Sequence, residues 1–314
     1  MDLFVEKYRP RYLDDFVGDN TVRTKIQEYL DTGKLQNLLL FGPAGTGKTS
    51  LAKLIVKQLE ADHLYINASD ERGIDTIRDK IIPFASSIGF NGLKVVILDE
   101  FDGVSDQYMK ALRGTIEQFH KSARFIATCN YFNKIPDNIQ SRFECINFDF
   151  TDSEETEILK MYLRRIYEIC QIEGMEIEKP ALLELVKRKF PDLRNTINVL
   201  QGYFAQGLTK ISEKDVTTFH GVFKDLFDHI YLETATPAVN YKFLVSNYGH
   251  RVDDVIKALG SDFVEYIQTE KPDDVKHLGE ICYEVNKHSY ESRFVIDPVV
   301  TMLSLVFKIQ KIVN

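Results

Sequence analysis

Cysteine is scarce in this sequence, and its placement favours neither metal binding nor a disulfide framework. The four cysteines, Cys129, Cys145, Cys170 and Cys282, lie far apart, and no Cys-x-x-Cys pair occurs. Zinc sites and disulfide-stapled folds both need closer or regularly spaced cysteines. We therefore expect each of the four to pack in the core as a small apolar side chain.

A long uninterrupted apolar segment is also missing. The most apolar stretch, residues 294–313, is broken by Asp297-Pro298 and carries Lys308 and Lys311, so it is too short to span a bilayer. The first seven residues hold acids where a signal peptide has an apolar core. These absences predict a cytoplasmic protein with no membrane partner.

There is no excess of basic charge. Lysine and arginine number 39 against 47 acids, which gives a formal net charge of −8. Such a balance does not predict a basic surface that attracts nucleic acid. Any contact with DNA must come from the local geometry of a few groups.

What is present is an ordinary globular composition over 314 residues, with 44% apolar and 27% charged side chains. That length exceeds what one hydrophobic core usually supports, so more than one domain is expected. Up to about residue 150, short apolar runs alternate with amphipathic segments, which is typical of an α/β domain with a parallel sheet. The expected strands cover 38–41, 63–66, 95–98, 125–128 and 145–148. The expected helices lie near 21–31, 49–59, 74–87 and 106–119.

The pattern changes after Phe150. The segment 151–155 combines capping residues with acids, which is a helix-start signature, and helical patterns follow to the end of the chain. A second change near residue 220 precedes four or five further helices. We therefore predict an α/β domain over 1–150 and two all-helical domains, over 151–220 and 221–314.

One segment carries a complete phosphate-binding motif. The run from Gly42 to Thr49 matches the P-loop pattern, follows an expected strand and opens an expected helix. Its glycines let backbone N–H groups converge on phosphates, and the helix N-terminus adds a partial positive charge. Lys48 would contact the outer phosphates of ATP, and the Thr49 hydroxyl would bind Mg²⁺. The expected nucleotide-binding residues here are Gly42, Pro43, Ala44, Gly45, Thr46, Gly47, Lys48, Thr49 and Ser50.

A pair of carboxylates supplies the second half of an ATPase site. Asp99 and Glu100 end an expected buried strand about fifty residues after the P-loop. Asp99 is placed to approach Mg²⁺, and Glu100 to polarise a water for attack on the terminal phosphate.

Three further polar residues stay undecided on spacing alone. Asn130, at the end of the next strand, can hold the attacking water or merely cap a turn. Arg142 and Arg194 can be functional or simply exposed.

Several motifs occur in a familiar order. They are Glu6-Lys7-Tyr8-Arg9-Pro10, the P-loop, residues 67–75, Asp99-Glu100-Phe101-Asp102, Ser141-Arg142-Phe143 and Leu193-Arg194. This set resembles the sliding-clamp loader ATPases of the AAA+ class and is similar to replication factor C small subunits. The Asp-Glu-Phe-Asp variant and the compact length look most like the large subunit of a T-even-type phage loader, whose setting would be the host cytoplasm.

The resemblance assigns roles to the undecided residues. Asn130 matches the first sensor and Arg194 the second sensor, which reaches the phosphates from the lid. Arg142 matches an arginine finger that acts in trans, on ATP bound to the neighbouring subunit. The residues expected around adenine and ribose are Tyr8, Arg9, Val17 and Gly18.

The resemblance also implies a DNA-binding segment. Gly73, just before Ile74, places a helix N-terminus at an exposed loop, where backbone amides can hold a DNA phosphate. The alternative is a capped helix that touches no ligand. The residues expected near DNA are Arg72, Gly73, Ile74, Arg78, Lys80 and, on a later helix, Arg113.

The resemblance thus implies a P-loop ATPase domain over 1–150, a helical lid over 151–220 and a helical collar domain that oligomerises over 221–314. It implies an ATP- and Mg²⁺-dependent subunit that opens a ring clamp and places it on primer–template DNA. Its expected partners are the sliding clamp, the DNA and other loader subunits, in a ring or spiral that is a pentamer with a companion small subunit. Two alternatives stay open, which are another AAA+ DNA-remodelling motor and a non-catalytic nucleotide-binding scaffold.

Overall fold

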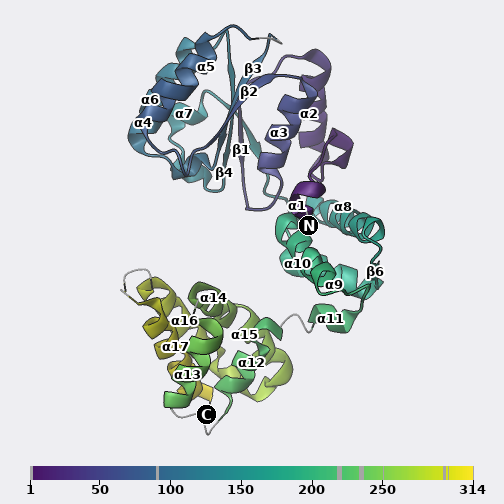
Figure 1. Cartoon of the computed structure of the whole chain (residues 1–314), viewed down its shortest axis with the longest axis vertical. Helices are drawn as coiled ribbons and strands as arrows, with labels where there is room; N and C mark the ends of the chain where they lie inside the picture. The colour runs from purple at the N-terminus through teal and green to yellow at the C-terminus, as the bar shows by residue number, and fades with distance from the viewer. Residues whose placement is uncertain are drawn as a thin grey trace. The chain divides into compact units, whose positions relative to one another are not determined.

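The computed structural model describes residues 3–89, 92–217, 221–232, 237–249, 251–292, 295 and 297–313. The chain divides into two compact units, with the boundary between Val216 and Thr217 (Figure 1). Each unit is described by itself below.

The first unit is built on a five-stranded parallel sheet with the strand order β2-β3-β4-β1-β5. In the register of the sheet, Leu38 pairs with Ile126 on one side and with Glu144 on the other. The strands are β1 (Leu38–Phe41), β2 (Asp62–Asn67), β3 (Lys94–Asp99), β4 (Arg124–Cys129) and β5 (Glu144–Asn147). All five expected strands are thus present, and the predicted α/β class with a parallel sheet is confirmed.

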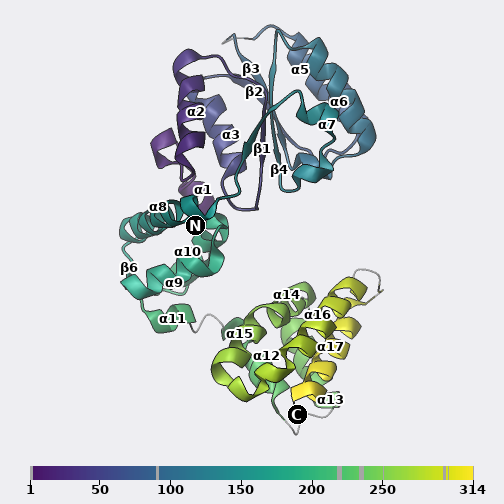
Figure 2. The ribbon, with the colours of Figure 1, turned by 180° about the vertical axis from the view of Figure 1, so that it is seen from behind.

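Helices cover both faces of this sheet. On one face lie α2 (Asn20–Thr32) and α3 (Lys48–Gln58), and on the other lie α4 (Ile74–Thr76), α5 (Ile82–Ser86), α6 (Asp106–Gln118) and α7 (Asp137–Gln140) (Figures 1 and 2). Short 3-10 turns occur at η1 (Leu13–Asp15), η3 (Phe101–Gly103) and η4 (Phe132–Lys134). Successive strand side chains point to opposite faces, so Val96 and Leu98 pack in one core while Val95 and Ile97 pack in the other. The apolar runs of the sequence are continuous because both faces are buried.

The helix expected over 74–87 is not regular. Its middle, η2 (Ile77–Ile81), is a π-helical segment between α4 and α5. Pro83 lacks a backbone N–H and its ring crowds the carbonyl four residues earlier, so a wider turn at this point is physically reasonable.

The rest of the first unit is mainly helical. It contains α8 (Asp152–Ile172), α9 (Lys179–Lys189), α10 (Leu193–Ala205) and α11 (Glu213–Thr217), with a parallel pair of two-residue strands, β6 (Glu176–Ile177) and β7 (Lys210–Ile211). Helix α8 begins at the expected signature, where Thr151 and Glu154 form a capping box. The N-terminal helix α1 (Phe4–Lys7) packs into the same core, through Phe4, as α8 to α10.

The second unit is all-helical in its described residues. Its α-helices are α12 (Gly221–Ile230), α13 (Pro237–Tyr248), α14 (Val252–Gly260), α15 (Asp262–Glu270), α16 (Leu278–Glu291) and α17 (Pro298–Val313), and η6 (Pro272–His277) is a 3-10 turn. The described part thus contains six α-helices, where the sequence led us to expect four or five. Only Ser261 separates α14 from α15, and a break that short leaves little trace in an apolar pattern.

The expectation that every cysteine packs in the core is wrong for two of them. Cys129 and Cys170 are buried, whereas Cys145 and Cys282 are exposed, and all four are free thiols. Cys145 lies on the edge strand β5, beside the buried Ile146, so the alternation of that strand turns Cys145 outward.

Within the described part of the chain, each helix is too short or too polar to cross a bilayer.

Candidate active site

Three neighbouring strands bring the predicted ATPase residues together. The P-loop follows β1, Asp99 and Glu100 follow from β3, and Asn130 follows β4, and these strands are adjacent in the sheet. Because the strands are parallel, all three groups lie at the same, carboxyl edge, which is where α/β sheets bind ligands.

Lys48 is a buried cation at the start of α3. Its ammonium group donates hydrogen bonds to the carbonyl oxygens of Gly42 at 2.7 Å and Pro43 at 2.6 Å. The side chain is only 7% exposed. Burial, with a smaller contribution from the positive charge of Arg194, lowers the pKa of Lys48 to about 8. The negative charge of a phosphate beside Lys48 would favour its charged form.

Asp99 is held by three hydroxyl groups. Thr49 donates to its Oδ1 at 2.7 Å and Thr128 to the same oxygen at 2.5 Å, while Tyr65 donates to Oδ2 at 2.6 Å. This places the Thr49 hydroxyl and one Asp99 oxygen side by side at the end of the P-loop. Such a pair of hard oxygen atoms suits Mg²⁺, which binds proteins through one or two oxygen ligands and takes the rest from phosphates and water.

Glu100 adopts a backbone conformation that is rare outside glycine. Its φ is 55°, in the left-handed region, and its N–H donates to Thr128 Oγ1 at 3.1 Å. The side chain is exposed at the edge of the sheet. A strained, exposed carboxylate beside a candidate metal ligand favours a functional role over that of an ordinary strand end.

Asn130 is also exposed, directly after β4. Asp102 fixes the backbone here, because one of its carboxylate oxygens accepts hydrogen bonds from the N–H groups of Asn130 at 3.3 Å and Tyr131 at 3.0 Å. The Asn130 side chain thus lies on a backbone anchored next to Asp99 and Glu100.

A pocket beside the P-loop is suited to the nucleoside half of ATP. Arg9 binds there through Nη1 to Ser50 Oγ at 3.2 Å. Tyr8 is tied to α8 by its hydroxyl, which donates to Glu173 at 2.5 Å. Gly18 does not line the pocket, but Phe16 does. A β-carbon at Gly18 would overlap the ring of Phe16. The residues that line the pocket include Tyr8, Arg9, Phe16, Val17, Gly45, Thr46, Gly47, Ser50, Arg165 and Arg194.

Helix α10 touches the P-loop through its first turn. Asp192 caps this helix by accepting from the N–H of Asn195 at 2.9 Å. Gly45 has a φ of 76°, and a β-carbon built on it would overlap the carboxylate of Asp192. Arg194, on the same turn, is exposed and lines the nucleoside pocket. The helical part of the first unit therefore contributes directly to the candidate ATP site.

Arg142 lies at the amino ends of the strands, opposite the carboxyl ends that hold the P-loop. It comes just before β5, and Asn37, which comes just before β1, donates to its backbone carbonyl oxygen at 3.2 Å. The four residues of β1, at about 3.3 Å each, separate this edge from the P-loop by on the order of 10 Å or more. Arg142 is thus not brought together with the other predicted catalytic residues of its own chain.

The sequence matches two described families in succession. Residues 38–149 match the ATPase family associated with various cellular activities, AAA. Residues 154–211 match a family described as the sliding-clamp-loader large subunit, AAA+ ATPase lid domain.

Several relatives are named as subunits of replication factor C. A replication factor C small subunit from Archaeoglobus fulgidus is 33% identical over 98% of both chains. Another from Halobacterium salinarum is 43% identical over 66% of this chain, a match that spans 64% of that protein. Replication factor C subunit 5 of Mus musculus is 37% identical over 69% of this chain and 65% of its own length.

This chain belongs to the replication factor C small-subunit family.

Membership, together with the clamp-loader lid match, makes it an ATP-hydrolysing subunit of a clamp loader in DNA replication. Solved structures of Thermotoga maritima RuvB are also similar. The Holliday junction branch migration motor has a TM-score of 0.53 at 22% identity, over 77% of this chain and 80% of that chain. A mutant of that protein has a TM-score of 0.57 at 19% identity, over 83% and 88%. At these identities the likeness shows the shared fold alone.

The residues predicted to approach DNA lie on the helical layer opposite α3. Arg72, Gly73, Arg78 and Lys80 are exposed around α4 and η2, Ile74 is half-buried, and Arg113 is exposed on α6. Two of these cations already have acidic partners, since Lys80 pairs with Glu71 at 2.7 Å and Arg78 with Asp75 at 3.7 Å. Phosphate binding would have to displace or bridge these weak, exposed pairs.

Several site residues escaped the sequence analysis. Thr128 and Tyr65 hold Asp99, Asp102 holds the Asn130 backbone, and Asp192 abuts the P-loop. Thr128 and Asp102 stood inside or next to motifs already singled out, so their positions were a usable signal. Asp192 directly precedes the Leu193-Arg194 motif and carried a similar signal, whereas Tyr65 gave none, because only the pairing of β2 with β3 brings it to the site.

Within the described residues, His, Cys, Asp and Glu side chains form no cluster of three suited to a metal ion. A magnesium ion held by Thr49 and Asp99 would take its other ligands from the nucleotide and from water. When bound, Mg²⁺ would neutralise charge on the phosphates, and Lys48 would add a further positive charge.

Proposed function

We propose that this protein hydrolyses ATP at interfaces between adjacent subunits of a clamp loader. In this proposal Lys48 binds the outer phosphates, Thr49 and Asp99 bind Mg²⁺, and Glu100 accepts a proton from the attacking water. Asn130 orients that water, and Arg194 reaches the phosphates from α10.

The observation that carries the proposal is the separation of Arg142 from the P-loop. Arg142 and the P-loop both adjoin the same sheet, yet they lie at opposite ends of its strands. This separation supports an action of Arg142 on the nucleotide of a neighbour packed head to tail rather than on that of its own chain. Contacts of this heterologous kind build rings or spirals rather than two-fold dimers.

We further propose that the loader uses ATP to open a sliding clamp and place it on primer–template DNA. The exposed cations around α4 and on α6, together with the backbone amide at Gly73, are suited to phosphates rather than to bases. The assembly would be a pentamer with a companion small subunit, as the likeness to T-even-type phage loaders suggests, working in the cytoplasm of the host cell.

The test measures ATP turnover by the assembled loader with its clamp, on primed DNA and on blunt duplex. We expect the primed junction to stimulate turnover, and Arg142→Ala to lower it by on the order of 10³, as arginine fingers do elsewhere. The matched control is Arg164→Ala, which removes an exposed arginine of α8. Glu100→Gln should abolish turnover while the subunit still binds ATP.

Two outcomes would contradict the proposal. Normal turnover by Arg142→Ala would show that Arg142 does not act as an arginine finger on the neighbouring subunit's ATP. Equal turnover on primed and blunt DNA would instead favour a general AAA+ motor.

A further inference from the structure

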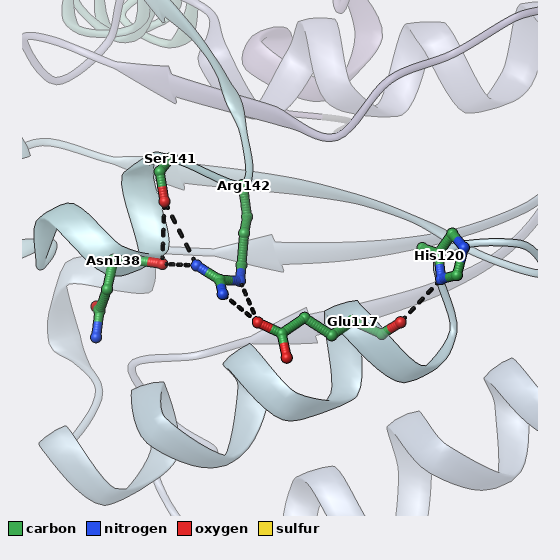
Figure 3. A network of polar contacts seen from close by, with 5 residues as sticks. All are labelled: Glu117, His120, Asn138, Ser141 and Arg142. Atoms are coloured by element: carbon green, nitrogen blue, oxygen red, sulfur yellow. Dashed lines mark hydrogen bonds and ion pairs between the residues drawn. The ribbon is translucent and has the colours of Figure 1, made fainter.

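The tip of Arg142 is held by a carboxylate on α6. Its Nε donates to Glu117 Oε1 at 3.0 Å, and its Nη2 forms an ion pair with the same oxygen (Figure 3). On its other side, Nη1 donates to the carbonyl oxygen of Asn138 and, at 3.4 Å, to Ser141 Oγ. The guanidinium group is therefore fixed from two directions.

The backbone of Arg142 is fixed separately. Asn37 donates to the carbonyl oxygen of Arg142, and its own Oδ1 accepts from the N–H of Phe125 at 3.0 Å. This ties the backbone of Arg142 to the amino ends of β1 and β4. The sheet thus sets where the side chain starts, and Glu117 sets where it ends.

These contacts still leave the guanidinium able to bind a phosphate. Arginine has five N–H donors, and the contacts to Glu117, Asn138 and Ser141 use at most four of them. The Arg142 side chain is 27% exposed, and it lines an open cavity of about 340 Å³ together with His120, Gln36 and Asn37. A free donor on a partly exposed, oriented group is what an incoming phosphate needs.

The ion pair is poorly placed to serve stability. Glu117 is 55% exposed, and exposed ion pairs contribute little to folding. Its geometry, with both bonds on the same edge of the guanidinium, instead restricts the rotation of a long, flexible side chain. Ordering such a side chain in advance strengthens the contacts it makes later.

We propose that Glu117 is a positioning residue that orients Arg142 toward the nucleotide of the neighbouring subunit. The inference rests on the proposed action of Arg142 in trans. Glu117 does not touch the reacting atoms in this scheme, and it acts only through Arg142.

The experiment compares Glu117→Ala with Arg142→Ala and with the double variant in the assembled loader. We expect Glu117→Ala to lower kcat roughly three- to tenfold with the KM for ATP unchanged, as expected for the loss of one ordered side chain. Glu117→Gln keeps an oxygen acceptor at the same place and should fall between Glu117→Ala and the native protein. The double variant should be no slower than Arg142→Ala alone, because Glu117 has nothing left to position.

A matched control removes another exposed partner of an arginine. Glu184 pairs with Arg188 on α9, and the two side chains are 36% and 22% exposed. We expect Glu184→Ala to leave kcat unchanged. ATP affinity of each isolated subunit serves as the folding control, and it should not change in any of these variants.

The outcomes separate this inference from the proposed function. If Arg142→Ala slows turnover but Glu117→Ala does so no more than Glu184→Ala, Glu117 has no positioning role and the finger stands. A double variant clearly slower than Arg142→Ala would show that Glu117 acts by another route. If Arg142→Ala turns over ATP normally, both the finger and this inference fall.

Discussion

At the scale of single residues, Lys48 combines a positive charge with burial before any nucleotide is bound. Burial lowers the pKa of Lys48 to about 8, and the carbonyl oxygens of Gly42 and Pro43 only partly replace water. Phosphates stabilise the charged form, so the pKa of Lys48 must rise when ATP binds. Linkage then ties ATP affinity to pH.

We expect the isolated subunit to bind ATP with full affinity below the pKa that Lys48 has in the subunit without ATP. Above that pKa the affinity should weaken. Between pH 7 and pH 9 the loss should be roughly tenfold, since binding then has to recover one proton. Titration calorimetry across this range provides the measurement. The control is Lys48→Arg, whose guanidinium stays charged, so its weaker affinity should not vary with pH through this group. An affinity of the native subunit that is constant over this range would contradict the assignment of Lys48 to the phosphates.

At the scale of elements, the start of α10 packs directly against the P-loop. Gly45 tolerates both its positive φ and its approach to Asp192 only because it has no β-carbon. The first turn of α10 therefore approaches the loop more closely than any other residue type at position 45 would allow.

Gly45→Ala should weaken ATP binding by about tenfold or more. Alanine at a positive φ is strained by about 1 kcal/mol or more, and its methyl group would push Asp192 and the adjacent Arg194 away from the loop. Equilibrium binding of a fluorescent ATP analogue measures this. Gly202→Ala, within α10 and with open space around its β-carbon, is the matched control and should bind normally. Equal binding by both variants would mean that the α10 contact does not shape the site.

At the scale of the whole molecule, the two units have separate cores. Phe227, Phe263 and Leu305 belong to the core of the second unit, whereas the two faces of the sheet and the helices α8 to α10 carry their own clusters. The predicted ATP site lies entirely in the first unit.

We expect scanning calorimetry to resolve two unfolding transitions, only one of which responds to Mg-ATP. At about 100 times its dissociation constant, ATP should stabilise the first unit by about 2.7 kcal/mol, because it binds the folded form alone. Lys48→Ala should remove this shift and leave both transitions in place. A single transition, or an equal shift of both, would show that the units unfold together.

Patterns in the amino-acid sequence were enough to predict the class of the sheet, the five strands and the P-loop with Asp99 and Glu100. These features are local, because buried parallel strands are continuous apolar runs and a phosphate loop needs glycines at fixed spacing. The sequence did not determine the π-helical segment at Ile77–Ile81 or the exposure of Cys145, which depend on how a helix or edge strand meets its neighbours.

Contacts between residues that are far apart in the chain became visible only in the folded molecule. Tyr65 reaches Asp99 because β2 pairs with β3, and Asp192 reaches Gly45 because α10 packs on the P-loop. Long-range packing also brings Glu117 into an ion pair with Arg142, and it holds Arg142 away from the P-loop of its own chain. Spacing along a chain cannot encode such contacts, since strand order and helix packing are set by long-range burial rather than by neighbours in sequence.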